Sequence, residues 1–338
     1  MSATYGYLSM FYHQLTFRPA PLPTSTNLSG QKALITGSNT GLGLAAAREL
    51  ASHGLSRLIL GVRSVSKGAA AAASIISESP GCAVEVWPLD QDDWGSVVMF
   101  ARRARDAFGD GDGDGVGRLD FVLLNAGVKR LEYTTASTGH EAHVQTNHLA
   151  TALLSLLLLD PLRRTARRTG RPGRMSITGS SVFFYAPVSD VAKPAIIPWL
   201  DDRASFKAGS QDRYCLSKLL LVLWVRELAA RVDGADVVVN VLNPGWCVSE
   251  FHRADPATRA ASRWGAYSAV QGGHCLVDAV VRHEGSHGGY VSEQKVKPVS
   301  NFVLSADGKA AQKRLWDETM AVFRTECPGD HLDEFQEW

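Results

Sequence analysis

From Lys32 onward, two kinds of hydrophobic pattern follow each other along the chain: short continuous apolar runs, and longer segments in which apolar residues recur at helical spacing. Short, continuously apolar runs predict strands over residues 32–36, 57–62, 83–89, 119–124, 174–178, 236–242 and 289–291. Segments with apolar residues at helical spacing predict helices over residues 42–53, 66–79, 92–108, 139–159, 214–231 and 264–282. Strands that alternate with helices in this way favour a single α/β domain, a doubly wound parallel sheet with helices on both faces.

The same pattern divides the chain into a central domain and less regular parts. Residues 1–27 are interpreted as an N-terminal extension, 28–305 as the domain, and 306–338 as a helical tail. Within the domain, residues 182–213 show no clear period, so we interpret them as an insertion that shapes a substrate pocket. The aromatic-rich stretch 5–15 either packs on its own domain or contacts a membrane surface or a partner.

Composition narrows the class of protein. The 338 residues carry 35 lysines and arginines against 34 acids, a net charge of +1, which gives no electrostatic reason to expect a nucleic acid partner. The five cysteines show no CxxC spacing and indicate reduced thiols in a reducing compartment. No apolar stretch approaches the roughly 18 residues of a membrane-spanning helix, and the N-terminus lacks a basic signal-peptide region. We therefore expect a cytoplasmic protein without a transmembrane segment.

The segment 109–117 reads GDGDGDGVG and begins like an EF-hand calcium loop. Such a loop requires a bidentate glutamate at its twelfth position, where this chain has Phe121. The segment is therefore predicted to be a flexible solvated turn, and no metal site is expected.

A glycine-rich turn, TGSNTGLG, joins the first predicted strand to the first predicted helix. Glycines there permit a tight turn and a close approach of a diphosphate, whose charge the helix N-terminus would favour. The turn alone is also compatible with a simple strand-to-helix connection. Its place at the first strand of the alternating pattern favours a dinucleotide site. The candidate residues are Gly37, Ser38, Asn39, Thr40, Gly41, Leu42 and Gly43.

Two further motifs follow in order at the ends of predicted elements, NAG at 125–127 and YCLSK at 214–218. With the G-x-x-x-G-x-G spacing of the turn, they resemble the short-chain dehydrogenase/reductase superfamily over about residues 28–292. The variants TGSNTGLG, GVRS and YCLSK are most similar to its retinol-dehydrogenase-like and protochlorophyllide-reductase-like branch. The resemblance implies a Rossmann fold, a nicotinamide cofactor and a carbonyl or alcohol substrate.

The resemblance assigns Tyr214 and Lys218 as a catalytic pair that also contacts the cofactor. A tyrosine and a lysine at i and i+4 share one helix face. An ammonium group near a phenol favours the phenolate, so we expect Lys218 to lower the pKa of Tyr214 from its usual value of about 10. Tyr214 would then exchange a proton with the carbonyl or alcohol oxygen. As an isolated motif, the same pair would be an exposed helical contact.

The resemblance also assigns Ser181, which follows the fifth strand, to a hydrogen bond with the substrate oxygen. Ser180 is the alternative for this role, and a turn or helix cap is the structural alternative for Ser181. Asn147 in VQTNHLA matches the family asparagine that holds a proton-relaying water. Asparagine is otherwise disfavoured within a helix, which favours this role over a plain surface position. The neighbouring His148 is interpreted as structural.

Other cofactor contacts follow from the same resemblance. The turn of Asn125, Ala126 and Gly127 would support the glycine-rich loop and contact the adenosine ribose, and Asp90 would cap the adenine amino group. The segment NPGWCVS matches the family segment whose backbone contacts the nicotinamide carboxamide. Its candidate residues are Pro244, Gly245, Val248 and Ser249. Each of these residues also has a plain interpretation as a turn residue.

The choice of cofactor depends on charge. An acidic residue about 20 positions beyond the glycines would bind a ribose 2′-hydroxyl, whereas an arginine accommodates a 2′-phosphate. Arg63 stands at that distance, and residues 57–68 contain no acid. NADP(H) is therefore predicted, with Arg63 as a solvated surface residue as the alternative.

These predictions favour an NADPH-dependent oxidoreductase that reduces a ketone or aldehyde, or oxidises the alcohol. Phe183, Phe184, Tyr185, Trp199 and Trp246 would line an apolar pocket for a small, polyketide-like or other secondary-metabolite substrate. The alternatives are a non-redox enzyme on the same fold, such as an epimerase, dehydratase or cyclase, and an inactive NADP-binding sensor or scaffold.

The apolar faces over 153–159 and 219–228 match helices that pair in family dimers, so a homodimer is expected. If the extension or the insertion covers these faces, the protein would instead be a monomer.

Overall fold

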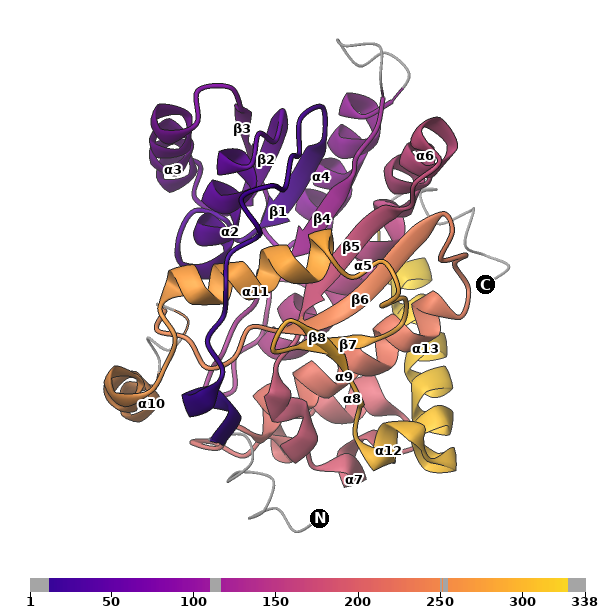
Figure 1. Ribbon diagram of the computed structural model, residues 1–338. Coiled ribbons are helices and arrows are strands. Elements are labelled where there is room, and N and C mark those ends of the chain that lie inside the picture. The colour runs from indigo at the N-terminus through magenta and orange to yellow at the C-terminus, as the bar shows by residue number, and fades with distance from the viewer. Residues whose placement is uncertain (1–11, 110–116, 250, 252–254, 328–338) are drawn as a thin grey trace.

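A single twisted sheet forms the centre of the computed structural model, which describes residues 12–109, 117–249, 251 and 255–327 (Figure 1). Its strands are β1 (Lys32–Thr36), β2 (Arg57–Val62), β3 (Ala83–Pro88), β4 (Phe121–Leu124), β5 (Gly173–Thr178), β6 (Val237–Asn243), β7 (Tyr290–Ser292) and β8 (Lys295–Lys297). Their order is β3-β2-β1-β4-β5-β6-β7-β8, and all neighbours are parallel except the antiparallel pair β7 and β8. The order reverses between β1 and β4, so the predicted doubly wound α/β fold is confirmed.

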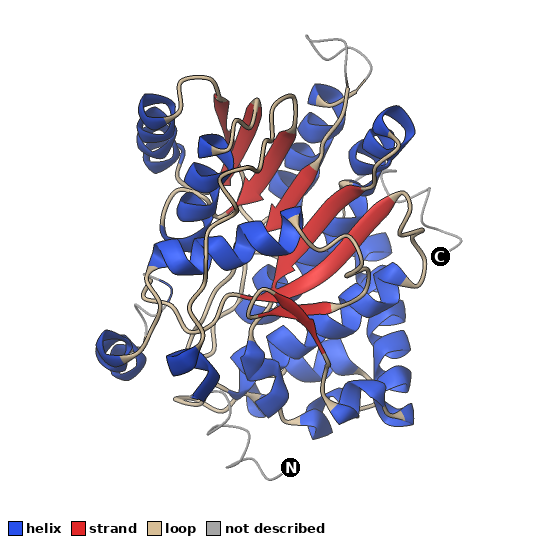
Figure 2. Ribbon diagram, in the orientation of Figure 1, coloured by secondary structure: helices blue, strands red, loops and turns tan. Residues whose placement is uncertain are grey.

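Helices cover both faces of this sheet (Figure 2). The longer ones are α2 (Gly41–Ser52), α3 (Val65–Glu78), α4 (Trp94–Ala107), α5 (Ala150–Leu157), α6 (Leu159–Thr169), α9 (Asp212–Ala229), α11 (Ala269–Val281) and α13 (Ala306–Glu326). One buried cluster joins the sheet to α2, α3 and α11, and a second joins it to α4, α5, α9 and α13. In β1, Ile35 faces the first cluster and Leu34 the second, as expected for a strand buried on both sides.

The single helix predicted over 139–159 is divided in the structure. A π-helical turn, η1 (Val144–Leu149), precedes α5, and the backbone breaks at Leu158 before α6 begins. Pro161 lies in the first turn of α6, where its missing N–H leaves no helical hydrogen bond unmade. The apolar period that suggested one helix therefore runs through three elements.

The segment 182–213 folds into short elements rather than an extended loop. These are η2 (Ser181–Tyr185), α7 (Val188–Val191), α8 (Ile196–Asp201) and η3 (Arg203–Ser205). The glutamate Glu318 of α13 accepts hydrogen bonds from the backbone N–H groups of Ile196 and Ile197 at 2.9 and 2.8 Å. These two hydrogen bonds fix the segment 182–213 against the C-terminal helix α13.

The helix α13 covers the surface on which a homodimer was expected. Trp316 of α13 stacks on Trp224 of α9 with ring centroids 4.5 Å apart and an angle of 15° between the ring planes. His148 packs edge-on against Trp224 and contacts the hydroxyl of Thr319 at 2.9 Å, which agrees with its structural interpretation. The apolar residues of 153–159 and 219–228 are buried within one chain, so these faces cannot form the predicted dimer contact.

Residues 12–22 cross the carboxyl edge of the sheet and return to the domain. The backbone N–H of Leu22 donates to Glu49 of α2, and Ala20 exchanges two hydrogen bonds with Gln294 in the turn between β7 and β8. Of the aromatic-rich stretch 5–15, Gln14 is buried against the domain, whereas Tyr12 and Leu15 are exposed. Residues 5–11 lie outside the described part, as do residues 110–116 of the glycine- and aspartate-rich segment. Among the helices described, none has the length and apolar character needed to cross a bilayer.

Candidate active site

A large cavity opens at the carboxyl edge of the sheet, where β1, β4, β5 and β6 end. Its volume of 1790 Å³ exceeds the roughly 300–1,000 Å³ of a pocket for one drug-sized ligand. The predicted residues that line it are Gly37, Asn39, Thr40, Gly41, Leu42, Arg63, Asp90, Asn125, Ala126, Gly127, Ser181, Tyr214, Lys218, Pro244, Gly245 and Ser249. Ser38, Gly43, Asn147 and Val248 do not line it. One cavity therefore joins the glycine-rich turn to the Tyr214–Lys218 pair.

The glycine-rich turn leaves space for a cofactor diphosphate. Gly41 has φ of +60°, and a Cβ built on it would meet only Ser249 at 3.9 Å, so the turn is open toward the cavity. No side chain would fit at Gly43, because a Cβ built there would lie 2.4 Å from the carbonyl oxygen of Gly37. The first turn of α2 carries no acidic residue, and Thr40 makes no side-chain cap. These residues fit an anionic group at the helix N-terminus.

The NAG turn supports this loop through Asn125. Its side-chain amide donates to the carbonyl oxygens of Thr36 and Gly37, both at 3.2 Å. By contrast, the Ser38 side chain points inward and donates to the carbonyl of Ile35 at 2.9 Å, so any contact of Ser38 with a cofactor would come from its backbone.

Tyr214 and Lys218 lie one turn apart on α9, and both are buried. The Lys218 ammonium is 5.8 Å from the Tyr214 ring centroid and donates to the carbonyl oxygen of Thr178 at 2.8 Å. Burial lowers the pKa of Lys218 to about 7. Burial also raises the pKa of Tyr214, opposed by a hydrogen bond with the Ser180 side chain, so the expected lowering by Lys218 is not found. Desolvation of the phenolate outweighs the other influences, and the phenol stays protonated near neutral pH.

The Ser180 side chain makes a hydrogen bond with the Tyr214 phenol. Ser180 is in extended conformation, with φ of −171°, immediately before η2 begins. Ser181 starts the helical turn, and its backbone N–H donates to the Asn243 side chain at 3.0 Å. Ser180, the alternative to Ser181 for the substrate-binding role, is thus the serine that the structure joins to the phenol.

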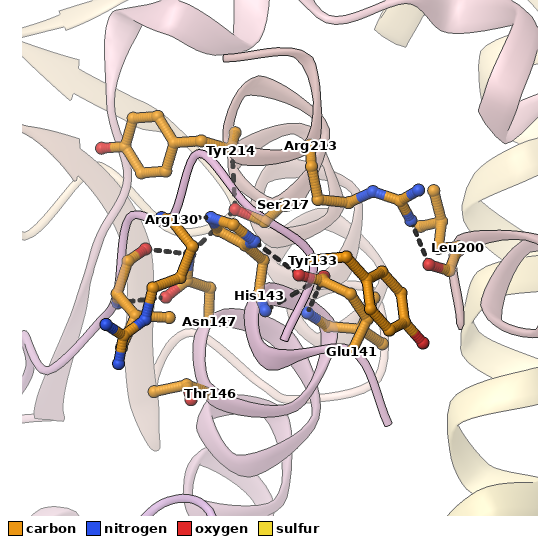
Figure 3. A network of polar contacts seen from close by, with 12 residues as sticks. Arg130, Tyr133, Glu141, His143, Thr146, Asn147, Leu200, Arg213, Tyr214 and Ser217 are labelled. Atoms are coloured by element: carbon orange, nitrogen blue, oxygen red, sulfur yellow. Dashed lines mark hydrogen bonds and ion pairs between the residues drawn. The ribbon is translucent and has the colours of Figure 1, made fainter. Parts of the chain in front are cut away.

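Asn147 lies behind the cavity wall, on the π-helical turn η1 (Figure 3). Its side-chain oxygen accepts from the Val128 N–H at 2.7 Å, and its amide donates to the Val128 carbonyl at 3.0 Å and the Ser217 hydroxyl at 2.9 Å. A Cβ built on Gly127 would lie 3.0 Å from the Asn147 oxygen and 3.9 Å from the Lys218 ammonium. The Asn147 side chain thus fixes the NAG turn beside Lys218 and does not itself face the cavity.

Two basic side chains in the cavity wall were not found from the sequence. Lys129 forms a buried ion pair with Asp255 at 2.7 Å. Burial alone would raise the pKa of Asp255, but its hydrogen bonds with Lys129 and Thr258 lower the pKa to about 2. Asp255 also caps α10 (Pro256–Ala261), so the pair ties this helix to the NAG turn. Arg130 lines the cavity with a buried Nε that has no hydrogen-bond partner among the described residues. Neither residue belongs to a recognisable motif.

The aromatic wall of the cavity differs in part from the expected one. Phe184, Tyr185 and Trp246 line the cavity as predicted. Phe183 is instead buried in the core, and Trp199 packs against that core under the Lys193 side chain. The other aromatic rings of the wall are Phe17, Phe251, Tyr267 and Tyr290, and Phe251 lies 5.5 Å from the Tyr214 ring.

This fold and site define an α/β protein of the doubly wound class, with a glycine-rich turn and a Tyr–Lys pair in one cavity. Residues 31–181 match the family model described as short chain dehydrogenase. The chain is 48% identical over 294 residues to the short chain dehydrogenase sol3 of Alternaria solani, an alignment that covers 86% of this chain and 99% of that protein. It is 36% identical over 321 residues to the short chain dehydrogenase/reductase mfmJ of Annulohypoxylon moriforme, which covers 93% of this chain and 90% of the relative. The chain belongs to the short-chain dehydrogenase/reductase family.

Solved structures agree with the fold. A short chain dehydrogenase from Burkholderia cenocepacia in complex with NADP superimposes with a TM-score of 0.57 at 24% identity, over 79% of this chain and 97% of that one. L-sorbose reductase from Gluconobacter frateurii, complexed with NADPH and L-sorbose, gives a TM-score of 0.58 at 20% identity over 79% and 96% of the two chains. The retinol-dehydrogenase-like branch stays a prediction.

Proposed function

We propose that this protein is an NADPH-dependent carbonyl reductase in which Tyr214 is the proton donor. The observation that carries the proposal is a buried phenol, hydrogen-bonded to Ser180 and one helical turn from Lys218, in the same cavity as the glycine-rich turn. NADPH supplies a hydride to the carbonyl carbon when it is bound. The names of the neighbours bound to NADP and NADPH support this cofactor.

In the proposed mechanism the protein acts on the carbonyl oxygen. The Ser180 hydroxyl orients that oxygen, and the Tyr214 phenol gives it a proton as negative charge develops there. Carbonyl reduction requires the protonated phenol, and burial holds Tyr214 in that form near neutral pH. Lys218 binds the nicotinamide ribose and is held in position by the Thr178 carbonyl.

The aromatic wall supports an apolar, ring-containing substrate. Phe184, Phe251 and Trp246 offer ring surfaces within the cavity. Lys129, one of the basic residues at its wall, is paired with Asp255. Such a wall would accommodate a polyketide-like or other secondary-metabolite ketone. The relatives named as short chain dehydrogenases support the class of reaction.

Loss of NADPH absorbance with a panel of cyclic and aromatic ketones and aldehydes tests the proposal. We expect turnover with apolar ring ketones. Tight NADPH binding without turnover of any carbonyl would instead favour a sensor, and conversion of a substrate without NADPH consumption would favour a non-redox enzyme.

The two serines provide a matched pair of substitutions. We expect Ser180→Ala to reduce kcat by about 10²–10³-fold, the usual cost of losing one oxygen-stabilising donor. Ser181→Ala is expected to lower kcat less than Ser180→Ala, because Ser180 is the serine with a hydrogen bond to the proton-donating phenol. Steady-state kinetics of both variants decides between the two residues, and the opposite ranking would restore the original assignment of Ser181.

Arg63 is proposed to select NADPH through its 2′-phosphate. A charge-assisted contact of this kind contributes about 1.5–3 kcal/mol, or roughly ten- to a hundredfold in affinity. Arg63→Ala is therefore expected to raise the Kd of NADPH by that factor and leave the Kd of NADH nearly unchanged. Lys67 is the control, because it is exposed and does not line the cavity. Equal loss for both cofactors in Arg63→Ala, or an equal effect of Lys67→Ala, would contradict this role.

A further inference from the structure

The N-terminal segment contributes a buried glutamine to the cavity wall, 232 residues away in sequence from its hydrogen-bond partner Trp246. The Gln14 side-chain oxygen accepts from the backbone N–H of Trp246 at 2.9 Å, and the Gln14 amide donates to the backbone carbonyl of Trp246 at 3.0 Å. The same amide donates to the carbonyl of Gly265 at 3.0 Å. The Gln14 residue is 8% exposed, so these bonds are made out of contact with bulk water.

The loop that follows β6 is packed between Gln14 and Tyr267. Gly245 has φ of +79°, and a Cβ built on it would lie 2.6 Å from the Tyr267 ring and 3.2 Å from the Gln14 oxygen, so the loop is packed closely from both sides. The Trp246 carbonyl also accepts from the backbone N–H of Tyr267 at 2.8 Å. Gln14 therefore occupies the place that a neighbouring strand would have and pairs with both polar groups of the Trp246 backbone.

The segment that carries Gln14 is anchored independently of this side chain. The Tyr267 hydroxyl donates to the Phe17 carbonyl at 3.1 Å, and the contacts of Ala20 and Leu22 fix the chain further along. Phe17 and His13, on either side of Gln14, line the cavity with it. The segment thus belongs to the wall of the active site, and loss of the Gln14 amide alone is not expected to release it.

We infer that Gln14 is a positioning residue of the active site, which fixes the Gly245–Trp246 backbone where the nicotinamide end of the cofactor binds. This inference rests on the proposed function, because it takes the loop after β6 as the nicotinamide side of the cavity. The adenosine end is formed by other residues, at the glycine-rich turn and Arg63. Gln14 consequently affects one half of the cofactor and not the other.

Calorimetric titration with two probes separates these halves. NADPH reaches both ends of the cavity, whereas 2′,5′-ADP carries the adenosine and 2′-phosphate but no nicotinamide. Gln14→Met keeps the volume of the side chain and removes its hydrogen bonds, and Gln14→Glu keeps the acceptor but turns a carboxylate oxygen toward two carbonyls. Thr16→Ala is the matched control, because Thr16 is exposed and its hydroxyl donates to the Tyr12 carbonyl at 2.7 Å within the same segment.

We expect Gln14→Met to raise the Kd of NADPH about tenfold, the effect of losing one or two net hydrogen bonds, with the Kd of 2′,5′-ADP unchanged. Gln14→Glu should weaken NADPH further at neutral pH, and Thr16→Ala should match the wild type for both probes. Unchanged NADPH affinity in Gln14→Met, or an equal loss for both probes, would overturn the positioning role. Failure of the wild type to bind either probe would overturn the proposed function itself, which is a distinguishable result.

Discussion

Replacing Tyr214 by phenylalanine is expected to lower kcat for ketone reduction by about 10²–10⁴-fold, the usual contribution of a positioned general acid. The ring would keep its packing against Phe251, 5.5 Å away, and lose only the hydroxyl that gives the proton. The Kd of NADPH should stay close to that of the wild type, because most of the cofactor affinity is expected at the glycine-rich turn and Arg63. Single-turnover kinetics and fluorescence titration measure the two quantities separately.

Tyr133→Phe is the matched control for this substitution. The Tyr133 hydroxyl donates to the carbonyl of Asp201 at 2.7 Å, and Tyr133 does not line the cavity. It also removes one phenol hydroxyl, and kcat should remain near the wild-type value. Near wild-type turnover in Tyr214→Phe would assign proton donation to another group and leave the tyrosine a structural role.

The parts of the site that the sequence predicts correctly are those fixed by short spacing. Tyr214 and Lys218 face one cavity because positions i and i+4 share a helix face, and the glycine-rich turn lies at the carboxyl end of β1 because strand and helix meet there. The strand–helix alternation likewise predicts the sheet, since the central strands β1, β4 and β6 are buried on both faces. Local pattern and fold agree at these positions.

Where the predictions differ from the structure, the deciding contact is not local. Ser180 and Ser181 are neighbours in the sequence, and the hydrogen bond between Ser180 and the phenol is seen only in the folded chain. Gln14 meets Trp246 across most of the chain, so no spacing in the sequence connects them. The pKa of Tyr214 depends on burial, which a motif does not report. These features need the folded arrangement before they can be seen.

The packing of the C-terminal helix is another feature that the sequence alone did not predict. A helical tail was predicted over residues 306–338, but the surface that it covers was not. In the structure, Trp316 of α13 is buried against Trp224 of α9, one of the two helices expected to form a dimer. The apolar face of α9 is thus explained by a partner within the same chain.

Trp316→Ala is expected to lower the free energy of unfolding by about 3–5 kcal/mol, the usual cost of truncating a buried aromatic side chain. Trp316 is 1% exposed, stacks on Trp224 at 4.5 Å, and carries the Arg231 guanidinium 4.2 Å from its ring centroid. The substitution removes all of these contacts and leaves a cavity between α13 and α9. Urea unfolding followed by circular dichroism measures the change.

Lys313→Ala, on the same helix, is the control for Trp316→Ala. The Lys313 side chain is 70% exposed and forms a surface ion pair with Asp317, so its loss should change the unfolding free energy by about 0.5 kcal/mol or less. Both substitutions introduce alanine into the same helix, so the two results differ mainly by the burial of the side chain that is removed. A loss below about 1 kcal/mol in Trp316→Ala would be too small for a fully buried indole. It would mean that α13 does not pack on α9 in solution, and the helix faces at 153–159 and 219–228 would again be available for a dimer.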